Sequence, residues 1–497
     1  MPEPIRLRVE GWPPRRWHTD LAAALAGDLG VTTCLDVGPT AQAPMRTYVG
    51  RVLALERLLE RADQRYLAPT PMDPPGPRND DLVVDLSADP EPPRQMWRVL
   101  FDGRPGHTVA AQAIARGRLP VVTVVDPAGS VRAEGRPGTE HPGLLSTALS
   151  DVLTGTGSLL AAALAGRAVC PPTPEAGEPE RARPKHVGRL AIEKVAHKTL
   201  HAGYRMLTRS PHWRVGWRPL QDADESTSLT GHLPLQWASL PDDGYHFYAD
   251  PFILEHQGRA YLFVEDFDHR VGRAHISVVE MGDDGPRGTP SAVLTRDVHL
   301  SYPFVLEDRG HIWMIPETSG ANRIEIFRAV RFPDRWEHEA VLVNDVTASD
   351  ATLLHHDGRW WMFATVWTGG SYSDHLHLWS APELLGPWLP HPANPVLIDI
   401  ASARPAGRFI HHDGRLLRPT QDGRGGYGAA LNIMEVTRLD EYGFTQRPLA
   451  NIVPGAGWQG RRIHTLNQSE RFEVVDGSRV APRVTILRRA LDRMGIP

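Results

Sequence analysis

Between residues 211 and 480, apolar and polar positions alternate in short runs that are separated by turns. Two such runs joined by a turn recur, as in "DPFILEHQGRAYLFVED" at 250–266 and "YPFVLEDRGHIWMIPET" at 302–318. Strict alternation is typical of β-strands with one buried face, and a polar residue followed by Gly is typical of a tight hairpin turn. The pattern therefore predicts a series of β-hairpins.

These hairpins form an internal repeat. The glycines of the first four turns are Gly258, Gly310, Gly358 and Gly414. Their spacings of 52, 48 and 56 residues lie in the range of propeller blades. A fifth, weaker hairpin lies at 464–477. We therefore predict a five-bladed β-propeller over residues 211–480, closed by "WRVGWRP" (213–219) as the outer strand of the last blade.

The first third of the chain alternates strand-like runs with longer runs of helical period. The expected strands are Ile5–Glu10, Leu82–Leu86 and Leu119–Val125, and the expected helices are Thr19–Leu29, Tyr48–Ala62 and Leu144–Ala165. This alternation predicts a small α/β domain over residues 1–168. A Pro-rich, charged segment and a basic helix then indicate a linker and connector over 169–210. Residues 481–497 are expected to form a C-terminal tail.

The bulk composition narrows the class of partner. The chain has 497 residues, 41% of them hydrophobic, which suits two or more globular domains. Its net charge of −5 provides no basic surface for nucleic acid. We find two cysteines, no leader peptide and no apolar run near 18 residues. These features predict a cytoplasmic protein without a transmembrane segment.

Polar residues gather where the strands of the hairpins begin and end. The first strand of each propeller blade lines the channel, so the residues that open these strands meet at one mouth. They are Asp250, Tyr302, Asp350, Arg404 and His464. The second strands return to the same end and add Glu265, Asp266, Glu317, Gln421 and Asp422. Although Asp and Arg can also cap strands or bridge blades, this ring of polar residues predicts a binding or catalytic site.

Two other features have a structural explanation. The "HHDG" segments at 355–358 and 411–414 look like metal-ligand clusters, but Asp-Gly is common in hairpin turns, and we interpret both as turns. The strands also contain Trp313, Trp360, Trp361 and Trp379. We interpret these tryptophans as packing between blades, with stacking on a sugar ring as the alternative for one near the mouth.

Seven motifs over about residues 212–477 also resemble a known family. They are "YADPF", "HLSYPFV", "MIPET", "SDATLL", "RWWMFAT", "ARPAGRF" and "RPTQD…YG". They resemble the β-propeller region of the plant glucosamine inositolphosphorylceramide transferases and of bacterial relatives, several of which are named formyltransferases. The resemblance implies a degenerate, formyltransferase-like domain of Rossmann-like fold before the propeller. No formyl transfer is expected, because the Asn, His and Asp set of such enzymes is not recognisable there.

More distantly, the propeller is similar to glycoside hydrolase family 43 and to the levansucrase and invertase group. In those enzymes a first-blade Asp is base or nucleophile, a third-blade Asp is a stabiliser and a fourth-blade Glu is the general acid. Asp250 and Asp350 match the first two places, whereas Arg404 stands at the third. Arginine suits phosphate or carboxylate better than proton donation, so the substitution favours glycosyl transfer from a phosphorylated donor or recognition of an acidic sugar. Glu317 or Asp422 is the alternative acid.

The leading hypothesis is a carbohydrate-active enzyme that acts on a sugar or glycolipid linked to a nucleotide or lipid phosphate. Asp250, Asp350 and Glu317 are the catalytic candidates. The expected substrate wall consists of Tyr248, Tyr302, Arg404, Arg418, Gln421 and Asp422. The alternatives are a glycoside hydrolase, a non-catalytic carbohydrate-recognition propeller, and a separate activity in the α/β domain. The resemblance also implies a channel Ca²⁺ beside His464, although this hard cation prefers oxygen ligands.

Overall fold

The computed structural model describes most of the α/β region and of the propeller. The described residues are 4–10, 15–38, 48–59, 70, 82–88, 96–174, 207–220, 229, 237–454 and 460–483. The predicted connector helix and the C-terminal tail after residue 483 lie outside these ranges.

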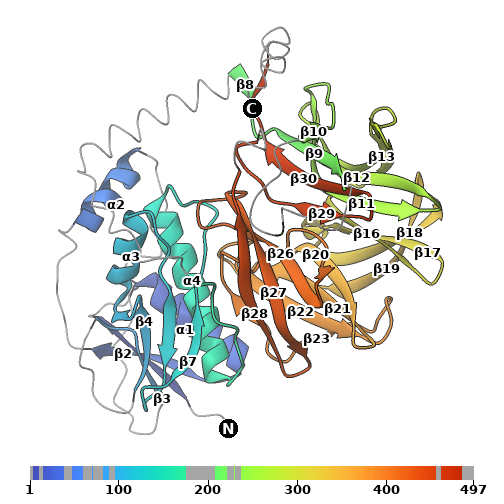
Figure 1. Ribbon diagram of the computed structural model, residues 1–497. Helices are drawn as coiled ribbons and strands as arrows, with labels where there is room; N and C mark the ends of the chain where they lie inside the picture. The colour runs from blue at the N-terminus through green and yellow to red at the C-terminus, as the bar shows by residue number, and fades with distance from the viewer. Residues whose placement is uncertain are drawn as a thin grey trace.

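The N-terminal region contains one sheet with the strand order β2-β1-β3-β4-β6-β7 (Figure 1). Its strands are β1 (Ile5–Glu10), β2 (Thr33–Gly38), β3 (Leu82–Asp85), β4 (Trp97–Phe101), β5 (Arg104–Pro105), β6 (Val122–Val125) and β7 (Val131–Gly135). Strands β2, β1, β3 and β4 pair in parallel, whereas β6 and β7 continue the sheet in antiparallel pairing. The three expected strands are present. The first has the bounds of β1, and the other two differ from β3 and β6 at one end, by one and three residues.

Helices pack against this sheet. They are α1 (Arg16–Leu29), α2 (Tyr48–Leu59), α3 (His107–Ala115) and α4 (Leu145–Leu164). Helix α4 is rich in Ala and Leu, and its buried side chains belong to the same hydrophobic core as those of β1 and α1. By length and composition alone α4 could cross a membrane, which corrects the expectation that no apolar run approaches 18 residues. Because 67% of its most apolar window is buried inside the protein, core packing accounts for that composition.

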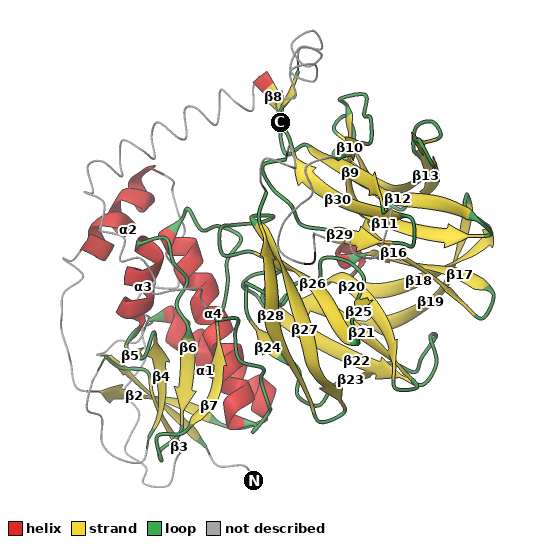
Figure 2. Cartoon of the chain, in the orientation of Figure 1, coloured by secondary structure: helices red, strands yellow, loops and turns green. Residues whose placement is uncertain are grey.

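The second region consists of five sheets, the blades of a five-bladed β-propeller (Figure 2). Blades 1 and 2 comprise β11 (His246–His256), β12 (Arg259–Asp268), β13 (Arg273–Gly282), β14 (Gly285–Pro286) and β15 (Ser291–Leu294), and then β16 (Ser301–Asp308), β17 (His311–Glu317), β18 (Arg323–Arg331) and β19 (Arg335–Asn344). Blades 3 and 4 comprise β20 (Ala348–His356), β21 (Arg359–Val366), β22 (His375–Ala381), β23 (Leu389–Pro390) and β24 (Leu397–Ile398), and then β25 (Ile410–His412), β26 (Arg415–Asp422), β27 (Ala430–Asp440) and β28 (Gly443–Ile452). Blade 5 comprises β29 (Leu466–Gln468), β30 (Phe472–Ser478), β9 (Trp213–Pro219) and β10 (Ala238–Ser239). The predicted blade number is confirmed.

Blade 5 closes the ring with strands from both ends of the propeller. Strand β9 pairs with β30 along its whole length, from Trp213 opposite Ser478 to Pro219 opposite Phe472. The segment 213–219 therefore lies in the last blade, as predicted. It is the third strand of that blade and not the outer one, because β10 pairs with its other edge. A short ladder of β8 (Thr208–Arg209) with β31 (Ala481–Pro482) lies next to this closure in the chain.

Two-residue turns join the inner hairpins of blades 1 to 4. The turn pairs are Gln257-Gly258, Arg309-Gly310, Asp357-Gly358 and Asp413-Gly414, and all eight residues have positive φ. This conformation matches the type I′ turn, which tolerates Gly and Asp well. Both "HHDG" segments are thus turns, as predicted. The tryptophans of the strands lie buried in the blade cores, which confirms the packing interpretation.

The two regions meet at a buried junction. The backbone of Arg136, just after β7, donates to the Ile398 carbonyl at 2.7 Å and accepts from Ile400 at 3.0 Å, so β7 continues alongside β24. The Nη1 atom of Arg136 lies 3.4 Å from Oδ1 of Asp399, and both side chains are buried. The N-terminal region is therefore fixed against blade 3.

Candidate active site

The inner strands of blades 1, 2 and 3 share an irregularity where they enter the channel. Asp250, Tyr302 and Asp350 have φ of +47°, +44° and +58°, and each sits at a shift of strand register. Such bulges re-aim one side chain out of the alternation of the strand, and non-glycine residues at positive φ are enriched at functional sites. The same local distortion therefore presents one polar residue from each of three blades.

Asp250 is buried in a cluster of polar groups from blade 5. Its Oδ1 accepts a hydrogen bond of 2.7 Å from Thr465 and lies 3.2 Å from Nε2 of His464. Its Oδ2 accepts from the Tyr302 backbone N–H at 3.2 Å. Burial acts to raise the pKa of Asp250, but His464 and Thr465 outweigh it and hold the pKa below its usual value. Asp250 is therefore ionised at neutral pH and can act as a base or a nucleophile.

The group Asp250, His464 and Asp476 has the spacing of a metal site, because one ligand atom from each residue lies within 4.8 Å of the others. However, Nδ1 of His464 lies 2.9 Å from Asp476 while Nε2 faces Asp250. Burial opposes protonation of His464, but the two carboxylates raise its pKa to about 10. An imidazolium has no lone pair for a metal. Asp250 and Asp476 are therefore better suited to hold the protonated His464 side chain between them than to bind a Ca²⁺ in the channel.

Asp350 and Arg404 form the second half of the site. Nε of Arg404 donates to Oδ2 of Asp350 at 2.6 Å, and Nε2 of Gln421 donates to the same oxygen at 3.0 Å. Oε2 of Glu317 accepts from the Asp350 backbone N–H at 3.2 Å and lies 3.8 Å from Nη2 of Arg404. Burial raises the pKa of Asp350 to about 8, with Arg404 opposing the rise and Glu317 and Asp250 adding to it.

The Nη groups of the Arg404 guanidinium make fewer hydrogen bonds than they can donate, and the side chain is 11% exposed. Nη1 donates to the Ser373 hydroxyl at 3.2 Å, and the guanidinium carbon lies 5.3 Å from the centre of the Tyr427 ring. The contact with Glu317 at 3.8 Å is too long for a hydrogen bond. N–H bonds of the two Nη groups are therefore available for the paired oxygens of a phosphate or carboxylate.

Glu265 is a further buried carboxyl of blade 1. Its Oε1 lies 3.2 Å from Nε2 of His299, while Nδ1 of His299 accepts from the Ala274 backbone N–H at 3.3 Å. Burial raises the pKa of Glu265, an effect that the contact with His299 opposes and the charge of Asp250 reinforces. Glu265 and His299 therefore form a buried pair beside Asp250.

The structure does not bring every predicted residue to this cluster. Arg418 is fully buried, where it donates to the carbonyls of Ser402 and Ala403 and contacts Phe363. Burial lowers its pKa to about 9. Asp422 faces away from Gln421 and binds Arg424 at 2.6 Å. These contacts give both residues structural roles, and substrate binding by them stays a prediction.

The two predicted tyrosines are also buried. Tyr302 has no exposed surface, and its hydroxyl lies 2.8 Å from the Thr352 hydroxyl and accepts a bond of 2.8 Å from the Gly407 backbone N–H. The ring thus links blades 2, 3 and 4 inside the channel. Tyr248 packs in the hydrophobic cluster that contains Val215 and Leu240. Contact of either ring with substrate stays a prediction.

Several residues of the cluster were not predicted as site residues from the sequence. They are Thr465, Asp476, Ser373, Tyr427 and His299. Asp476 could have been found, because it ends the second strand of the fifth hairpin, as Glu265 and Glu317 end those of the first two. The others lie in loops or at positions that differ from blade to blade.

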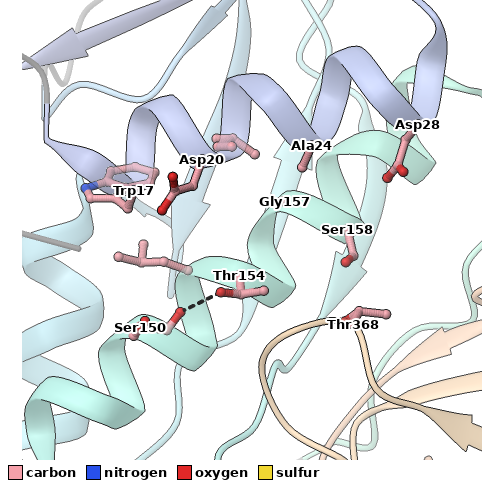
Figure 3. Close-up of a pocket in the computed structure, with 11 residues that line it drawn as sticks. Trp17, Asp20, Ala24, Asp28, Ser150, Thr154, Gly157, Ser158 and Thr368 are labelled. Atoms are coloured by element: carbon pink, nitrogen blue, oxygen red, sulfur yellow. Dashed lines mark hydrogen bonds between the residues drawn. The ribbon is translucent and has the colours of Figure 1, made fainter. Parts of the chain in front are cut away.

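A separate pocket of about 290 Å³ lies in the N-terminal region between α1 and α4, with Thr368 of the β21–β22 loop at its edge (Figure 3). Asp20 and Asp28 of α1 line one side, and Ser150, Thr154 and Ser158 of α4 line the other. Trp17 adds an apolar wall. This pocket, which the sequence did not reveal, contains none of the residues around Asp250 and Arg404.

Comparison with known proteins finds a similarity that covers the propeller. Residues 234–477 match the family model described as glucosamine inositolphosphorylceramide transferase 1, N-terminal. The propeller resembles this transferase family. The resemblance inferred from the seven sequence motifs is thereby confirmed.

Two relatives give the extent of the match. Glucosamine inositolphosphorylceramide transferase 1 of Oryza sativa subsp. japonica is 31% identical over 296 residues, which are 55% of this chain and 40% of the relative. The protein of the same name from Arabidopsis thaliana is 32% identical over 250 residues, which are 47% of this chain and 32% of the relative. The chain thus spans less than half the length of either relative.

Among solved structures, Zg3597, a family 117 glycoside hydrolase from Zobellia galactanivorans, is similar with 13% identity and a TM-score of 0.34. The match covers 49% of this chain and 77% of that one. A likeness at this level indicates nothing about activity.

Proposed function

We propose that the mouth of the propeller transfers a sugar from a phosphorylated donor to an acceptor hydroxyl. The observation that carries the proposal is the meeting of Asp350 and Glu317 with the Arg404 guanidinium, in the same channel as Asp250. The relatives' name, glucosamine inositolphosphorylceramide transferase, supports glucosamine and a glycolipid as the substrate classes. The match of residues 234–477 relates the propeller to the N-terminal part of that transferase.

Each group has a role in this reaction. Ionised Asp250 takes the proton of the acceptor hydroxyl, whose oxygen then attacks the anomeric carbon of the donor. The bond from that carbon to the phosphate oxygen breaks, and the electron pair leaves with the phosphate. The Nη groups of Arg404 neutralise this charge, so no proton donor is needed for departure. Asp350 and Glu317 hold Arg404 in place, and the smaller part of the Asp350 carboxyl that is ionised at pH 7 stabilises positive charge on the sugar ring.

Donor binding tests the proposal. We expect a sugar nucleotide or prenyl-phosphate sugar to raise the melting temperature of the wild type by several degrees, and to raise that of Arg404→Ala far less. Arg415→Ala is the matched control, because Arg415 is an exposed arginine at the opposite end of blade 4. Equal stabilisation of wild type and Arg404→Ala would contradict the proposal.

Turnover is tested with Asp250→Asn. We expect this variant to bind the donor as the wild type does but to transfer no sugar, because its amide cannot accept the proton. Transfer at the wild-type rate would remove Asp250 from the mechanism. If no transfer occurs in either protein and binding is equal, the propeller is a carbohydrate-recognition module.

Hydrolysis is a second candidate, and one observation favours it. Burial raises the pKa of Asp350 to about 8, against the effect of Arg404, so this carboxyl holds a proton at pH 7 in most molecules. A protonated carboxyl can serve as the general acid that a glycosidase needs. Release of free sugar from an unactivated glycoside, lost in Asp350→Asn, would favour hydrolysis over transfer.

A further inference from the structure

Glu140 of the N-terminal region contacts a loop of blade 3 through three hydrogen bonds. Its Oε1 accepts from the hydroxyl of Ser371 at 2.8 Å, from the backbone N–H of Tyr372 at 3.1 Å and from the hydroxyl of Ser373 at 2.9 Å. Ser371 and Ser373 are buried. A single carboxylate oxygen from one region thus orders three successive residues of the other.

Ser373 connects this carboxylate to the candidate active site. Its hydroxyl donates to Glu140 and accepts from Nη1 of Arg404 at 3.2 Å. A hydroxyl can do both at once, and the bond to an ionised acceptor fixes its orientation. Nε of the same guanidinium binds Asp350 at 2.6 Å. The continuous path is therefore Glu140, Ser373, Arg404 and Asp350.

The segment that carries Glu140 is itself fixed against the propeller. The Gly138 backbone N–H donates to Oδ2 of Asp374 at 2.7 Å, one residue after Ser373. A Cβ atom at Gly138 would lie 2.5 Å from the side chain of Ile400, so the backbone approaches blade 3 closely. The buried pair of Arg136 and Asp399 precedes this contact. Glu140 is thus held at a fixed place relative to Ser373.

We propose that Glu140 is a positioning residue for Arg404, so that the N-terminal region completes the active site of the propeller. The inference rests on the proposed function for the role of Arg404. It assigns to the N-terminal region a task in the chemistry of the other region, exerted through Ser373. Without Glu140, the Ser373 hydroxyl is free to rotate, and Arg404 loses the bond that sets its angle against Asp350.

The titration of Asp350 reports the position of Arg404 without any substrate. It is followed by carbon-13 NMR of protein labelled at the aspartate carboxyl carbon, with Asp350→Asn to assign the signal. The charged and titratable groups near Asp350 are Arg404, Glu317, Asp250, Tyr302 and Tyr427, and Gln421 donates to it. Because Arg404 lowers the pKa of Asp350, its displacement raises the midpoint of the titration.

Four variants separate the effect of the Glu140–Ser373 hydrogen bond on Asp350 from that of the negative charge of Glu140. In Glu140→Ala and Ser373→Ala we expect the Asp350 midpoint to rise by about one unit. Glu140→Gln keeps an acceptor oxygen but removes a negative charge, so its midpoint should stay at or below that of the wild type. Glu134→Ala is the control, because Glu134 lies on β7 and binds Thr123 of its own region. If Glu140→Ala fails to fold, Ser373→Ala decides, since it removes one of these bonds and leaves those of Glu140 to Ser371 and Tyr372 in place.

An unchanged midpoint in both Glu140→Ala and Ser373→Ala would overturn the inference. A midpoint that falls in Glu140→Ala as it does in Glu140→Gln would also overturn it. In that case the negative charge of Glu140, and not its hydrogen bond to Ser373, would account for its effect on the pKa of Asp350. Failure of the proposed function gives a different result. In that case no phosphorylated donor binds the wild type, while the midpoints still shift as described.

Discussion

Nε of Arg404 donates a hydrogen bond of 2.6 Å to Oδ2 of Asp350, and this bond joins blade 4 to blade 3 at the mouth of the channel. The bond uses Nε of the guanidinium, while Nη1 donates to the Ser373 hydroxyl at 3.2 Å and Nη2 lies 3.8 Å from Glu317. A planar group with donors on two edges can bind a carboxylate and a phosphate at the same time. In the proposed function, the arginine is therefore a bridge between Asp350 and the phosphate of the donor.

Arg404→Lys tests this bridging geometry. A lysine keeps the positive charge but has a single ammonium group, which cannot bind Asp350 and Ser373 and also present two parallel donors. We expect the affinity for the phosphorylated donor that stabilises the wild type to fall about tenfold, a typical loss for one charge-assisted hydrogen bond. Isothermal titration calorimetry measures this change, with Arg415→Lys as control. Wild-type affinity in Arg404→Lys would show that charge alone suffices.

His464 makes the stability of the propeller depend on pH. Its folded pKa of about 10 lies above the usual value, so its contribution is complete below about pH 6.5 and is lost as the pH rises toward 10. In His464→Ala, Asp250 and Asp476 lose the cation between them. We expect the free energy of unfolding at pH 6 to fall by about 3–5 kcal/mol.

Urea denaturation of wild type and His464→Ala at pH 6 and at pH 9.5 measures this dependence. Other groups that titrate in this range are common to both proteins. The difference between their free energies of unfolding therefore reports the contribution of His464 alone. We expect that difference to shrink at pH 9.5. A difference that is the same at both pH values would contradict protonation of His464 in the folded state.

Gly407 allows the segment before β25 to approach β29 closely next to the site. It has φ of +138°, and a Cβ atom there would lie 2.0 Å from the Leu466 carbonyl oxygen. Its N–H also binds the Tyr302 hydroxyl. We expect Gly407→Ala to lower the free energy of unfolding by more than about 2 kcal/mol, because the backbone of blade 4 must move away from blade 5.

Gly414 is the matched control for this substitution. It also has positive φ, +71°, but a Cβ atom there would meet nothing within 4 Å. Gly414→Ala should therefore cost about 1 kcal/mol, the conformational term alone. Chemical denaturation measures both variants. An equal loss of unfolding free energy in Gly407→Ala and Gly414→Ala would show that the close contact with Leu466 adds nothing to the cost.

The sequence predicted the propeller because its signals are local. The turn residues before Gly258, Gly310, Gly358 and Gly414 and the alternating strands repeat at a readable period. The outer strand of blade 5, β10, was not predicted, because a strand of two residues is too short to show an alternating pattern. Nor were the positive φ values of Asp250 and Asp350, since a bulge depends on pairing with the next strand.

The site was predicted less completely, for two physical reasons. Neighbouring residues on a strand point to opposite faces, so the sequence could not distinguish Gln421, which binds Asp350, from Asp422, which binds Arg424. Contacts between distant segments were also hidden. Glu140 and Ser373 are separated by more than two hundred residues, and no repeat or motif links them.

Tyr302→Phe distinguishes a structural tyrosine from one that binds substrate. The variant removes a buried hydroxyl and leaves the Gly407 N–H without its acceptor. We expect the free energy of unfolding to fall by about 1–3 kcal/mol, the cost of an unpaired buried donor. The affinity for the phosphorylated donor should stay within about twofold, because the Tyr302 ring has no exposed surface. A large loss of affinity without loss of stability would instead return Tyr302 to the substrate wall, and would require the channel to open when the ligand binds.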